Sequence, residues 1–551
     1  MSSDRSLLTL GTSLAFIAAM TGCSMNNPTT SPSAPASSAT SATAPAVVCE
    51  NPNVPTELPP AVTELGASTG TADGGPVIET SFPTVQGLPF AEVPTIASSG
   101  GKVTAEFNAT DASYTVGGRK ISGLTYQGQF MGPTLLVDPG DTIEITLKNS
   151  LKDPTNFHTH GMHTSPITTS DNVLRVMPGN GIDNPVLIEI PDEVAPGTYW
   201  YHAHLHGLTE AQVMGGLSGA IVISGLNDRL PDDLQSVPDH LLALKDVQLK
   251  GTSIVSTNID SNAPTTRLVN AQVNPVLKAQ PGCTQLLRLG NFSADIWYHL
   301  KLDAAKFSVI AVDANVVTRV EAQDELLLPP AKRYDVLVRW DEAGDYKLKT
   351  LAYSTGATGD TYPERVLATF KVAGEKAVPI EMPATMGELP TDQSPSMNDD
   401  KIAQKRTITF SEDNTAGTFF INGKQFSDGA PLLTAKLGTT EEWTIKNVTQ
   451  EFHPFHIHVN DFQVMSINGK PYDALSLQDT IPLPIGGEIV IRMRFIDYVG
   501  KYVFHCHILA HEDAGMMAAI AVTEDGKPPS IDQQDAWGQP LLDHTNMPGM
   551  P

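Results

Sequence analysis

Histidines with the spacing of metal ligands are the clearest chemical feature of this sequence. Ten of the 15 histidines fall into four short clusters, and every cluster contains a His-x-His pair. On an extended strand, residues two apart point to the same face, so each pair presents two imidazoles side by side. A single pair is weak support for a metal, but four pairs predict neighbouring metal ions. The ten residues are His158, His160, His202, His204, His453, His456, His458, His505, His507 and His511.

The fourth cluster favours copper over zinc. Cys506 lies between two histidines and is followed by His511 and Met516. The third cluster adds a further imidazole in His453. Two imidazoles, one thiolate and a weak thioether are the donors of a blue-copper electron-transfer site. A structural zinc site needs four ligands and has no use for the methionine, whereas this chain offers at least twelve candidates.

The segments around these clusters are typical of β-strands separated by turns. Alternating and β-branched residues dominate at 142–147, 219–223, 334–338 and 488–492, and no long helical period interrupts them. The 44 glycines and 42 prolines fit frequent turns. Three β-sandwich units of roughly 130–150 residues account for the length of 551 residues. We therefore predict an all-β chain that carries its histidines on strands.

In order and spacing, the four clusters resemble the copper signatures of the multicopper oxidases, a family that includes laccases, cuprous oxidases and ferroxidases. The resemblance covers about residues 85–525. It includes the segments 126–135 and 199–204, the Asn-Gly-Lys of 422–424 and, in a middle region without ligands, 333–338. The resemblance implies three cupredoxin-like Greek-key β-sandwich domains and four copper ions.

The resemblance assigns a copper ligand role to twelve residues. The type 1 copper would be bound by His453, Cys506 and His511, with Met516 as the axial ligand. The type 2 copper would be bound by His158 and His456. The two type 3 coppers would be bound by His160, His202, His204, His458, His505 and His507.

The implied activity is the oxidation of a donor by single electrons, coupled to the reduction of O2 to water. The tripeptide around Cys506 would carry electrons from the type 1 copper to the type 3 pair, because its two flanking histidines point the other way. Asp171 and Glu512 lie where related enzymes place acids near the three-copper centre. We expect both to relay protons, and the alternative is that they orient ligands by hydrogen bonding.

We expect the three domains at residues 85–225, 226–376 and 401–525. A linker at 377–400 separates the second from the third, and a tail follows at 526–551. The middle domain is assigned mainly by analogy, because it carries no expected ligand.

The N-terminus is typical of a targeting segment. Arg5 precedes a short apolar run that ends at Cys23 in a sequence resembling a bacterial lipobox. We expect a signal peptide at 1–23, a lipidated Cys23, and a flexible Ser/Ala/Pro-rich tether at 24–84. The chain would then be an exported lipoprotein, periplasmic or at the cell surface. The alternative is an ordinary cleaved signal peptide, with which Cys23 is lost.

Charge and the remaining cysteines limit the partners. The formal net charge of −26 disfavours binding to nucleic acid, because an acidic surface repels phosphates. The expected partners are O2 and a small electron donor, and we expect a monomer. Whether Cys49 and Cys283 form a disulfide stays open, since a sequence cannot show that they meet.

Two donor classes remain possible at this point. One is a phenolic or related aromatic donor, as for a laccase, and we favour it. The other is a reduced metal ion, chiefly Cu(I), in copper tolerance; soft thioethers would favour it. The candidates for such a Cu(I) site are Met382, Met386, Glu388, Asp392, Met397, Met547 and Met550. A non-enzymatic copper-binding envelope protein is a third class, which the complete ligand set disfavours.

Overall fold

The computed structural model describes residue 49 and residues 87–256, 259–260, 264–389, 396–427 and 429–541. The chain divides into two compact units, Met1–Pro45 and Ala46–Pro551. The first unit lies outside the described residues, as do the expected signal peptide, Cys23 and all of the tether except Cys49. Among the described residues, no helix is long and apolar enough to cross a membrane.

The first β-sandwich carries its two histidine clusters in a five-stranded sheet. That sheet has the order β1 (Thr95–Ala97), β4 (Thr134–Val137), β9 (Ser218–Ile223), β8 (Gly197–His202) and β6 (His158–His160). The facing sheet has the order β11 (Leu249–Lys250), β12 (Ser253–Ile254), β3 (Arg119–Thr125), β2 (Lys102–Val116), β5 (Thr142–Asn149) and β7 (Ile182–Glu189). Helix α1 (Thr209–Gly215) follows β8. Strands β6 and β8 pair with His158 opposite His202, so the two clusters meet.

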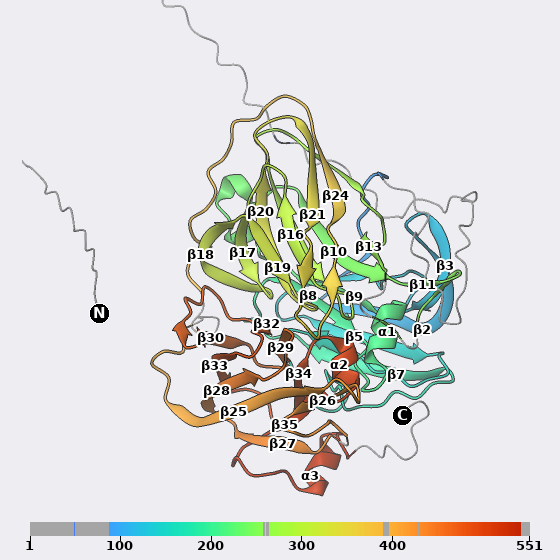
Figure 1. Cartoon of the computed structure of the whole chain (residues 1–551), viewed down its shortest axis with the longest axis vertical. Helices are drawn as coiled ribbons and strands as arrows, with labels where there is room; N and C mark the ends of the chain where they lie inside the picture. Colours follow the sequence, from blue (N-terminus) through green and yellow to red (C-terminus); the bar gives the residue numbers. More distant parts are fainter. Residues whose placement is uncertain are drawn as a thin grey trace, which may run out of the picture. The chain divides into compact units, whose positions relative to one another are not determined.

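The third β-sandwich repeats this plan (orange to red in Figure 1). Its five-stranded sheet has the order β27 (Pro431–Lys436), β35 (Met517–Thr523), β34 (Gly500–Cys506), β29 (His453–Ile457) and β32 (Thr480–Leu483). The facing sheet has the order β26 (Thr418–Ile421), β25 (Ile402–Asp413), β28 (Thr439–Asn447), β33 (Glu488–Phe495), β30 (Phe462–Ile467) and β31 (Lys470–Pro471). Helices α2 (Leu509–Asp513) and α3 (Ile531–Ala536) flank β35 in sequence. Strands β29 and β34 pair with His456 opposite His505.

The middle β-sandwich also has a six-stranded and a five-stranded sheet. The first has the order β13 (Thr266–Val269), β10 (Asp239–Val247), β15 (Thr284–Asn291), β20 (Arg333–Arg339), β17 (Phe307–Val312) and β18 (Asn315–Gln323). The second has the order β14 (Val276–Ala279), β24 (Arg365–Val372), β21 (Gly344–Thr350), β16 (Tyr298–Leu302) and β19 (Glu325–Leu328). Short elements complete it: η1 (Asn227–Arg229), η2 (Asp232–Leu234), β22 (Tyr353–Ser354) and β23 (Thr361–Tyr362).

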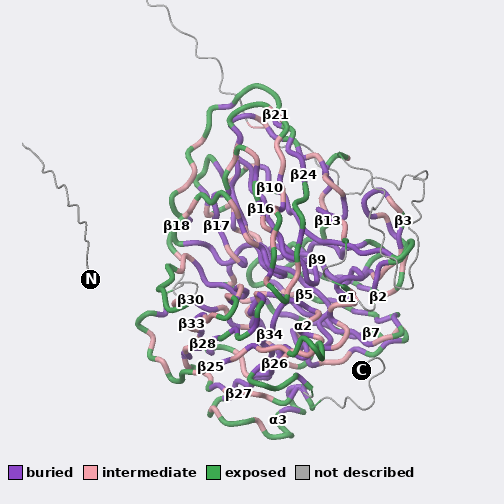
Figure 2. The backbone as a smooth tube through the Cα atoms, viewed as in Figure 1, coloured by how far each residue is buried: buried purple, intermediate pink, exposed green. Residues whose placement is uncertain are grey.

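Burial differs between the two sheets of each ligand-carrying domain. Strands β5 and β33 alternate buried with more exposed residues, as expected when one face packs on a core and the other meets water. Strands β8, β9, β29 and β34 are buried along their whole length (Figure 2). The strands next to the histidine clusters are therefore covered on both faces, and metal ligands placed there are shielded from water.

The prediction of an all-β fold with three cupredoxin-like β-sandwiches is confirmed. One connection does not follow the expected division into three domains. The hairpin of β11 and β12 lies within the range expected for the second domain, yet Ser253 pairs with Ser122 of β3 in the first. The described part of the tail, up to residue 541, packs against the rest of the chain. Gln539 is buried there and donates hydrogen bonds to the carbonyls of Pro166 and Lys501. The domain boundaries residue by residue stay a prediction.

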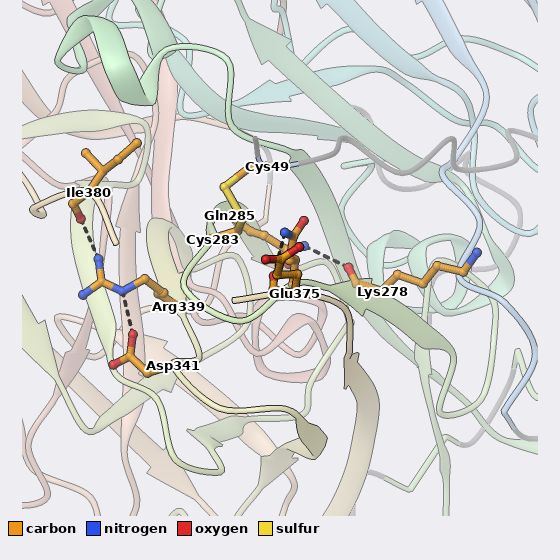
Figure 3. Close-up of a disulfide and its surroundings, with 9 residues drawn as sticks. Cys49, Lys278, Cys283, Gln285, Arg339, Asp341, Glu375 and Ile380 are labelled. Atoms are coloured by element: carbon orange, nitrogen blue, oxygen red, sulfur yellow. Dashed lines mark hydrogen bonds and ion pairs between the residues drawn. A yellow bond between two sulfur atoms is a disulfide. The ribbon is translucent and has the colours of Figure 1, made fainter. Parts of the chain in front are cut away.

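Cys49 and Cys283, which are 234 positions apart in the sequence, form a disulfide (Figure 3). The sequence alone could not show whether these two cysteines pair. Cys283 is buried next to β15 of the middle domain, where Gln285 donates a hydrogen bond to the carbonyl of Lys278. The disulfide therefore joins a position within the N-terminal tether to the middle domain.

Candidate metal centre

Nitrogen and sulfur donors gather in two places. The smaller set, which we name the cysteine group, consists of His453, Cys506 and His511. Cys506 Sγ lies 3.5 Å from His453 Nδ1 and 3.8 Å from His511 Nδ1, and the two nitrogens are 3.3 Å apart. Met516 is fully buried beside them, and its carbonyl accepts the backbone N–H of Cys506. Three donors thus converge on one point, with the thioether-bearing residue next to the thiol.

The larger set, the eight-histidine group, joins side chains of the first and third domains. Its closest contacts run from His505 Nε2 to His204 Nε2 at 3.2 Å and to His458 Nε2 at 3.3 Å. The rings of His160 and His456 stack with centroids 3.9 Å apart. Sets of three within it place their donor atoms inside 4.8 Å of one another. The members are His158, His160, His202, His204, His456, His458, His505 and His507.

Several rings in this group are fixed by a hydrogen bond on the nitrogen that faces outward. Nδ1 of His202 donates to the carbonyl of Ala203, and Nδ1 of His505 donates to the carbonyl of Cys506. Nδ1 of His158 is 2.9 Å from Asp171 Oδ1. The opposite nitrogens of His158 and His202 are buried without a hydrogen-bond partner among the described residues. Buried polar atoms are rarely left unpaired, so these nitrogens have the surroundings expected of metal ligands.

Burial also gives these side chains the protonation state that metal binding needs. It lowers the pKa of His202, His456, His505 and His511 to about 3, so each imidazole is neutral and keeps a lone pair. Burial raises the pKa of the Cys506 thiol well above its usual range. A bound cation is therefore needed to hold this sulfur as the thiolate.

Strand β34 connects the two groups. Cys506 is its last residue, and its side chain points toward the cysteine group. His505 and His507, on either side of it, belong to the eight-histidine group. Neighbouring residues of an extended segment point in opposite directions, so one tripeptide reaches both sets of donors.

The two acids that the sequence singled out both contact ligand candidates. The carboxylate of Asp171 accepts hydrogen bonds from the backbone and hydroxyl of Thr159, and it faces His158. Glu512 is buried, accepts a hydrogen bond from the Thr209 hydroxyl at 3.1 Å, and lies 3.5 Å from Nδ1 of both His204 and His505. Desolvation raises the pKa of Asp171 to about 8 and that of Glu512 well above its usual range. Relaying protons and orienting ligands both stay predictions.

Two acidic residues that the sequence analysis missed line the outer side of the cysteine group. Glu451 Oε1 lies 3.4 Å from His511 Nε2, and Glu412 Oε2 lies 3.7 Å from His453 Nε2. Glu412 Oε2 is buried with no hydrogen-bond partner in the described part of the chain. The ring of Phe419 stacks on His511 at 4.0 Å, and 14% of the His511 side chain is exposed. Part of the His511 side chain is therefore accessible to solvent.

A second missed pair lies behind the eight-histidine group. Asp479 Oδ1 is 3.2 Å from His160 Nε2, and the guanidinium of Arg333 binds the same carboxylate. Arg333 begins one of the segments that resemble the family, but its sequence surroundings indicate no role for it. Asp479 lies one residue before β32 begins, and its sequence neighbours give no other sign of a role.

Comparisons with known proteins agree with this arrangement. Sequence models described as multicopper oxidase match residues 226–372, 108–228 and 397–526. The multicopper oxidase mco of Staphylococcus haemolyticus is 30% identical over 440 residues, which cover 77% of this chain and 87% of that protein. A laccase of Bacillus subtilis is 27% identical over 475 residues, covering 73% and 90%.

Solved structures show the same fold. A multicopper oxidase of Campylobacter jejuni, described as a metallo-oxidase, superposes with a TM-score of 0.70 at 27% identity, covering 80% of this chain and 96% of that one. A laccase of Pediococcus acidilactici superposes with a TM-score of 0.67 at 24% identity, covering 80% of this chain and 95% of that one. The chain therefore belongs to the multicopper oxidase family, and it is a copper-dependent oxidoreductase that uses O2 and an electron donor.

Proposed function

We propose that this chain binds four copper ions and couples the one-electron oxidation of a small donor to the four-electron reduction of O2 to water. The observation that carries the proposal is the connection of the two donor groups through a single tripeptide, His505-Cys506-His507. Bound copper ions supply reversible one-electron chemistry, and four of them can together hold the electrons that O2 requires.

The ligand assignment follows the family pattern, and the buried donor atoms are consistent with it. We assign the type 1 site to His453, Cys506 and His511, with Met516 axial, because their donors converge. The type 2 site takes His158 and His456, whose Nε2 atoms are buried without partners among the described residues. The type 3 pair takes the remaining members of the eight-histidine group: His160, His202, His204, His458, His505 and His507.

The protein's own groups hold the protons that water formation consumes. We assign relay roles to Asp171, whose carboxylate faces His158, and to Glu512, which lies beside His204 and His505. The Thr209 hydroxyl donates to Glu512 Oε1 and fixes the orientation of that carboxyl group. Both acids also restrain ligand rings, so a variant of either is expected to disturb geometry as well as proton supply.

For the donor, we propose a phenol or related aromatic compound. The partly exposed edge of His511, stacked on Phe419, offers a flat apolar contact for a ring. The carboxylate of Glu451, 3.4 Å from His511 Nε2, can accept the O–H of a phenol next to that edge. Oxidation of a phenol releases a proton together with the electron, and an adjacent acceptor favours that step.

A reduced metal ion is the second candidate donor, and the pair Glu412 and Glu451 favours it. Two carboxylates next to the ligand histidines, one of them with an oxygen lacking a partner among described residues, suit a cation. The methionines favour Cu(I) less, because Met386 lies in a hydrophobic core, Met382 packs against that core, and Met397 is buried. Asp392, Met547 and Met550 lie outside the described residues.

Oxygen uptake by the copper-loaded protein tests the proposal. We expect uptake in air with a phenolic donor, at a higher kcat/KM than with Cu(I) or Fe(II). Faster uptake with a reduced metal ion would instead establish the second candidate. A fully loaded protein that consumes no oxygen with any of these donors would contradict the proposed function.

We further propose export, attachment to a membrane through lipidated Cys23, and a monomeric state. Disulfides persist in oxidising compartments outside the cytoplasm, so the Cys49–Cys283 bridge supports export. Cys23 itself lies outside the described residues. Mass spectrometry of the mature N-terminus distinguishes lipidation at Cys23 from ordinary cleavage, and light scattering of the purified protein gives its oligomeric state.

A further inference from the structure

The middle domain provides none of the proposed copper ligands, yet a buried ion pair links it to them. Arg333 is the first residue of β20, in the middle domain. Its two terminal nitrogens bind Asp479 of the third domain as a fork, at 2.9 and 2.7 Å. The two side chains are 0% and 1% exposed. A bidentate ion pair that is buried away from water fixes the orientation of both side chains.

Asp479 contacts a ligand histidine from each of the other two domains. Its Oδ1 accepts from Nε2–H of His160, at 3.2 Å. Its backbone carbonyl accepts from Nδ1–H of His456, at 2.8 Å. These bonds leave Nδ1 of His160 and Nε2 of His456 as the nitrogens with lone pairs, and both are buried with no hydrogen-bond partner within the described ranges. One residue therefore selects the tautomer of two rings from different domains.

The neighbouring backbone is shaped to admit this pair. Gly161 directly follows the first histidine cluster and has φ of +85°. A Cβ atom at this position would lie 2.5 Å from both Arg333 Nη2 and Asp479 Oδ2. A larger residue would therefore have to displace the ion pair, so a glycine is required for the pair and the cluster to coexist.

Further hydrogen bonds hold Arg333 in place from two sides. Its Nε donates to the carbonyl of Thr198, in the strand that leads to His202, and its Nη1 donates to the carbonyl of Ala331. The carboxylate of Asp313 accepts from the backbone N–H groups of Arg333 and of Asp479. The guanidinium thus has polar partners on the first, second and third domains, which offsets the cost of burying its charge.

We propose that Arg333 and Asp479 are positioning residues, through which the ligand-free middle domain orients His160 and His456 toward the three-copper site. This inference rests on the proposed copper assignment. Groups that hydrogen-bond a metal-bound histidine fix its ring and raise its basicity, and their loss typically weakens metal binding ~10–100-fold. The same loss is expected here for the eight-histidine group and not for the cysteine group.

The test uses full-length protein and measures copper binding, not only activity. Copper is titrated against a competing chelator into the wild type and into Arg333→Met, while the blue absorption and the type 2 EPR signal are followed. We expect Arg333→Met to keep the blue absorption per chain and to bind the other three coppers ~10–100-fold more weakly, with an altered type 2 signal. Arg333→Lys keeps the charge without the fork and should recover part of the affinity.

A matched control is available in the third domain. Arg406 forms a fork with Glu441 at 2.6 and 2.7 Å, and the other hydrogen bonds given for the pair, to the Thr434 carbonyl and from the Trp443 indole, reach no proposed ligand. Arg406→Met should lower the unfolding temperature and leave both copper signals as in the wild type. Asp479→Asn, which keeps a carbonyl oxygen for His160 and changes little volume, serves if Arg333→Met does not fold; it should still weaken copper binding and change the type 2 signal.

The outcomes separate this inference from the proposed function. A wild type that binds far fewer than four coppers contradicts the copper assignment itself. A wild type with four coppers, together with variants at Arg333 and Asp479 that keep wild-type affinity and EPR signals, overturns the positioning role. Equal loss at the blue site and at the three-copper site, as from general loosening of the fold, also overturns it.

Discussion

The cysteine group and the eight-histidine group are built from the same kind of donor but meet their surroundings differently. All eight rings of the larger group are buried between the first and third domains, and several are fixed by an outward hydrogen bond. In the smaller group, 14% of the His511 side chain is exposed, and the carboxyl group of Glu451 lies beside it. The contrast suits a division of labour in which electrons are taken up at the exposed edge and O2 is reduced where water is excluded.

Removal of all metal is expected to have the largest effect, because it empties both groups. Dialysis against a strong chelator should abolish oxygen uptake and the blue absorption together. Reloading with Cu(II) should restore both, whereas Zn(II), which fits imidazole and thiolate ligands but has no redox chemistry, should restore neither. Oxygen uptake by the zinc-loaded protein would contradict a copper-based division of labour.

Loss of an outward partner should impair only the buried group. Asp171→Ala removes the carboxylate next to His158 and Thr159. We expect ~10–100-fold weaker copper binding at the eight-histidine group, as for other residues that orient metal-bound histidines. The blue absorption of the cysteine group should stay at the wild-type level. Chelator titration with type 2 EPR provides the measurement. An equal loss of copper affinity at both groups would contradict the predicted difference between them.

A change at the exposed edge should affect the donor and leave the buried group intact. Glu451→Gln keeps the shape and removes an acid that lies 3.4 Å from His511 Nε2 and whose pKa is raised to about 8 by burial and by the nearby Glu412. Above pH 8, where the wild-type carboxylate is charged, KM for a cationic donor should be ~10-fold higher in the variant because the attraction between opposite charges is lost, with a smaller change for a phenol. Steady-state kinetics with both donors checks this. A loss of copper, with KM unaltered, would place Glu451 in the metal site and not at its edge.

The smallest effect on either group is expected from the disulfide. Replacing both Cys49 and Cys283 by alanine removes the bridge between the N-terminal tether and the middle domain, and this domain provides none of the proposed copper ligands. The stability of the chain should fall by about 2–5 kcal/mol, which a lower unfolding temperature would reveal. The blue absorption and the copper content at room temperature should be unaltered. Altered spectra would mean that the middle domain restrains the copper sites through this bridge as well.

The histidine-bearing strands could be predicted because their signals are local. His-x-His pairs and the Cys506 tripeptide are visible within a few residues, and alternation identifies strands such as β5 and β33. The partner of each ring could not be predicted in this way. Arg333 and Asp479 are 146 positions apart and in different domains, and nothing near either residue points to the other. A sequence pattern reports side-chain periodicity, whereas such a pair depends on how three domains pack.

The donor edge shows the same limit. Glu412 and Glu451 are two among 61 acidic residues, and only the fold places them beside His453 and His511. The same holds for the hairpin of β11 and β12, which crosses from the expected second domain to a sheet of the first. The bridge from Cys49 to Cys283 spans 234 positions, so the sequence left it open.

Replacement of the single cysteine of the copper site tests the central claim most directly. Cys506→Ser removes the sulfur from the cysteine group and leaves the eight histidines in place. We predict that the variant loses the blue absorption, keeps the type 2 EPR signal, and no longer consumes oxygen with any donor. Oxygen uptake at the wild-type rate in a variant without blue absorption would contradict the claim that electrons reach the buried group through Cys506.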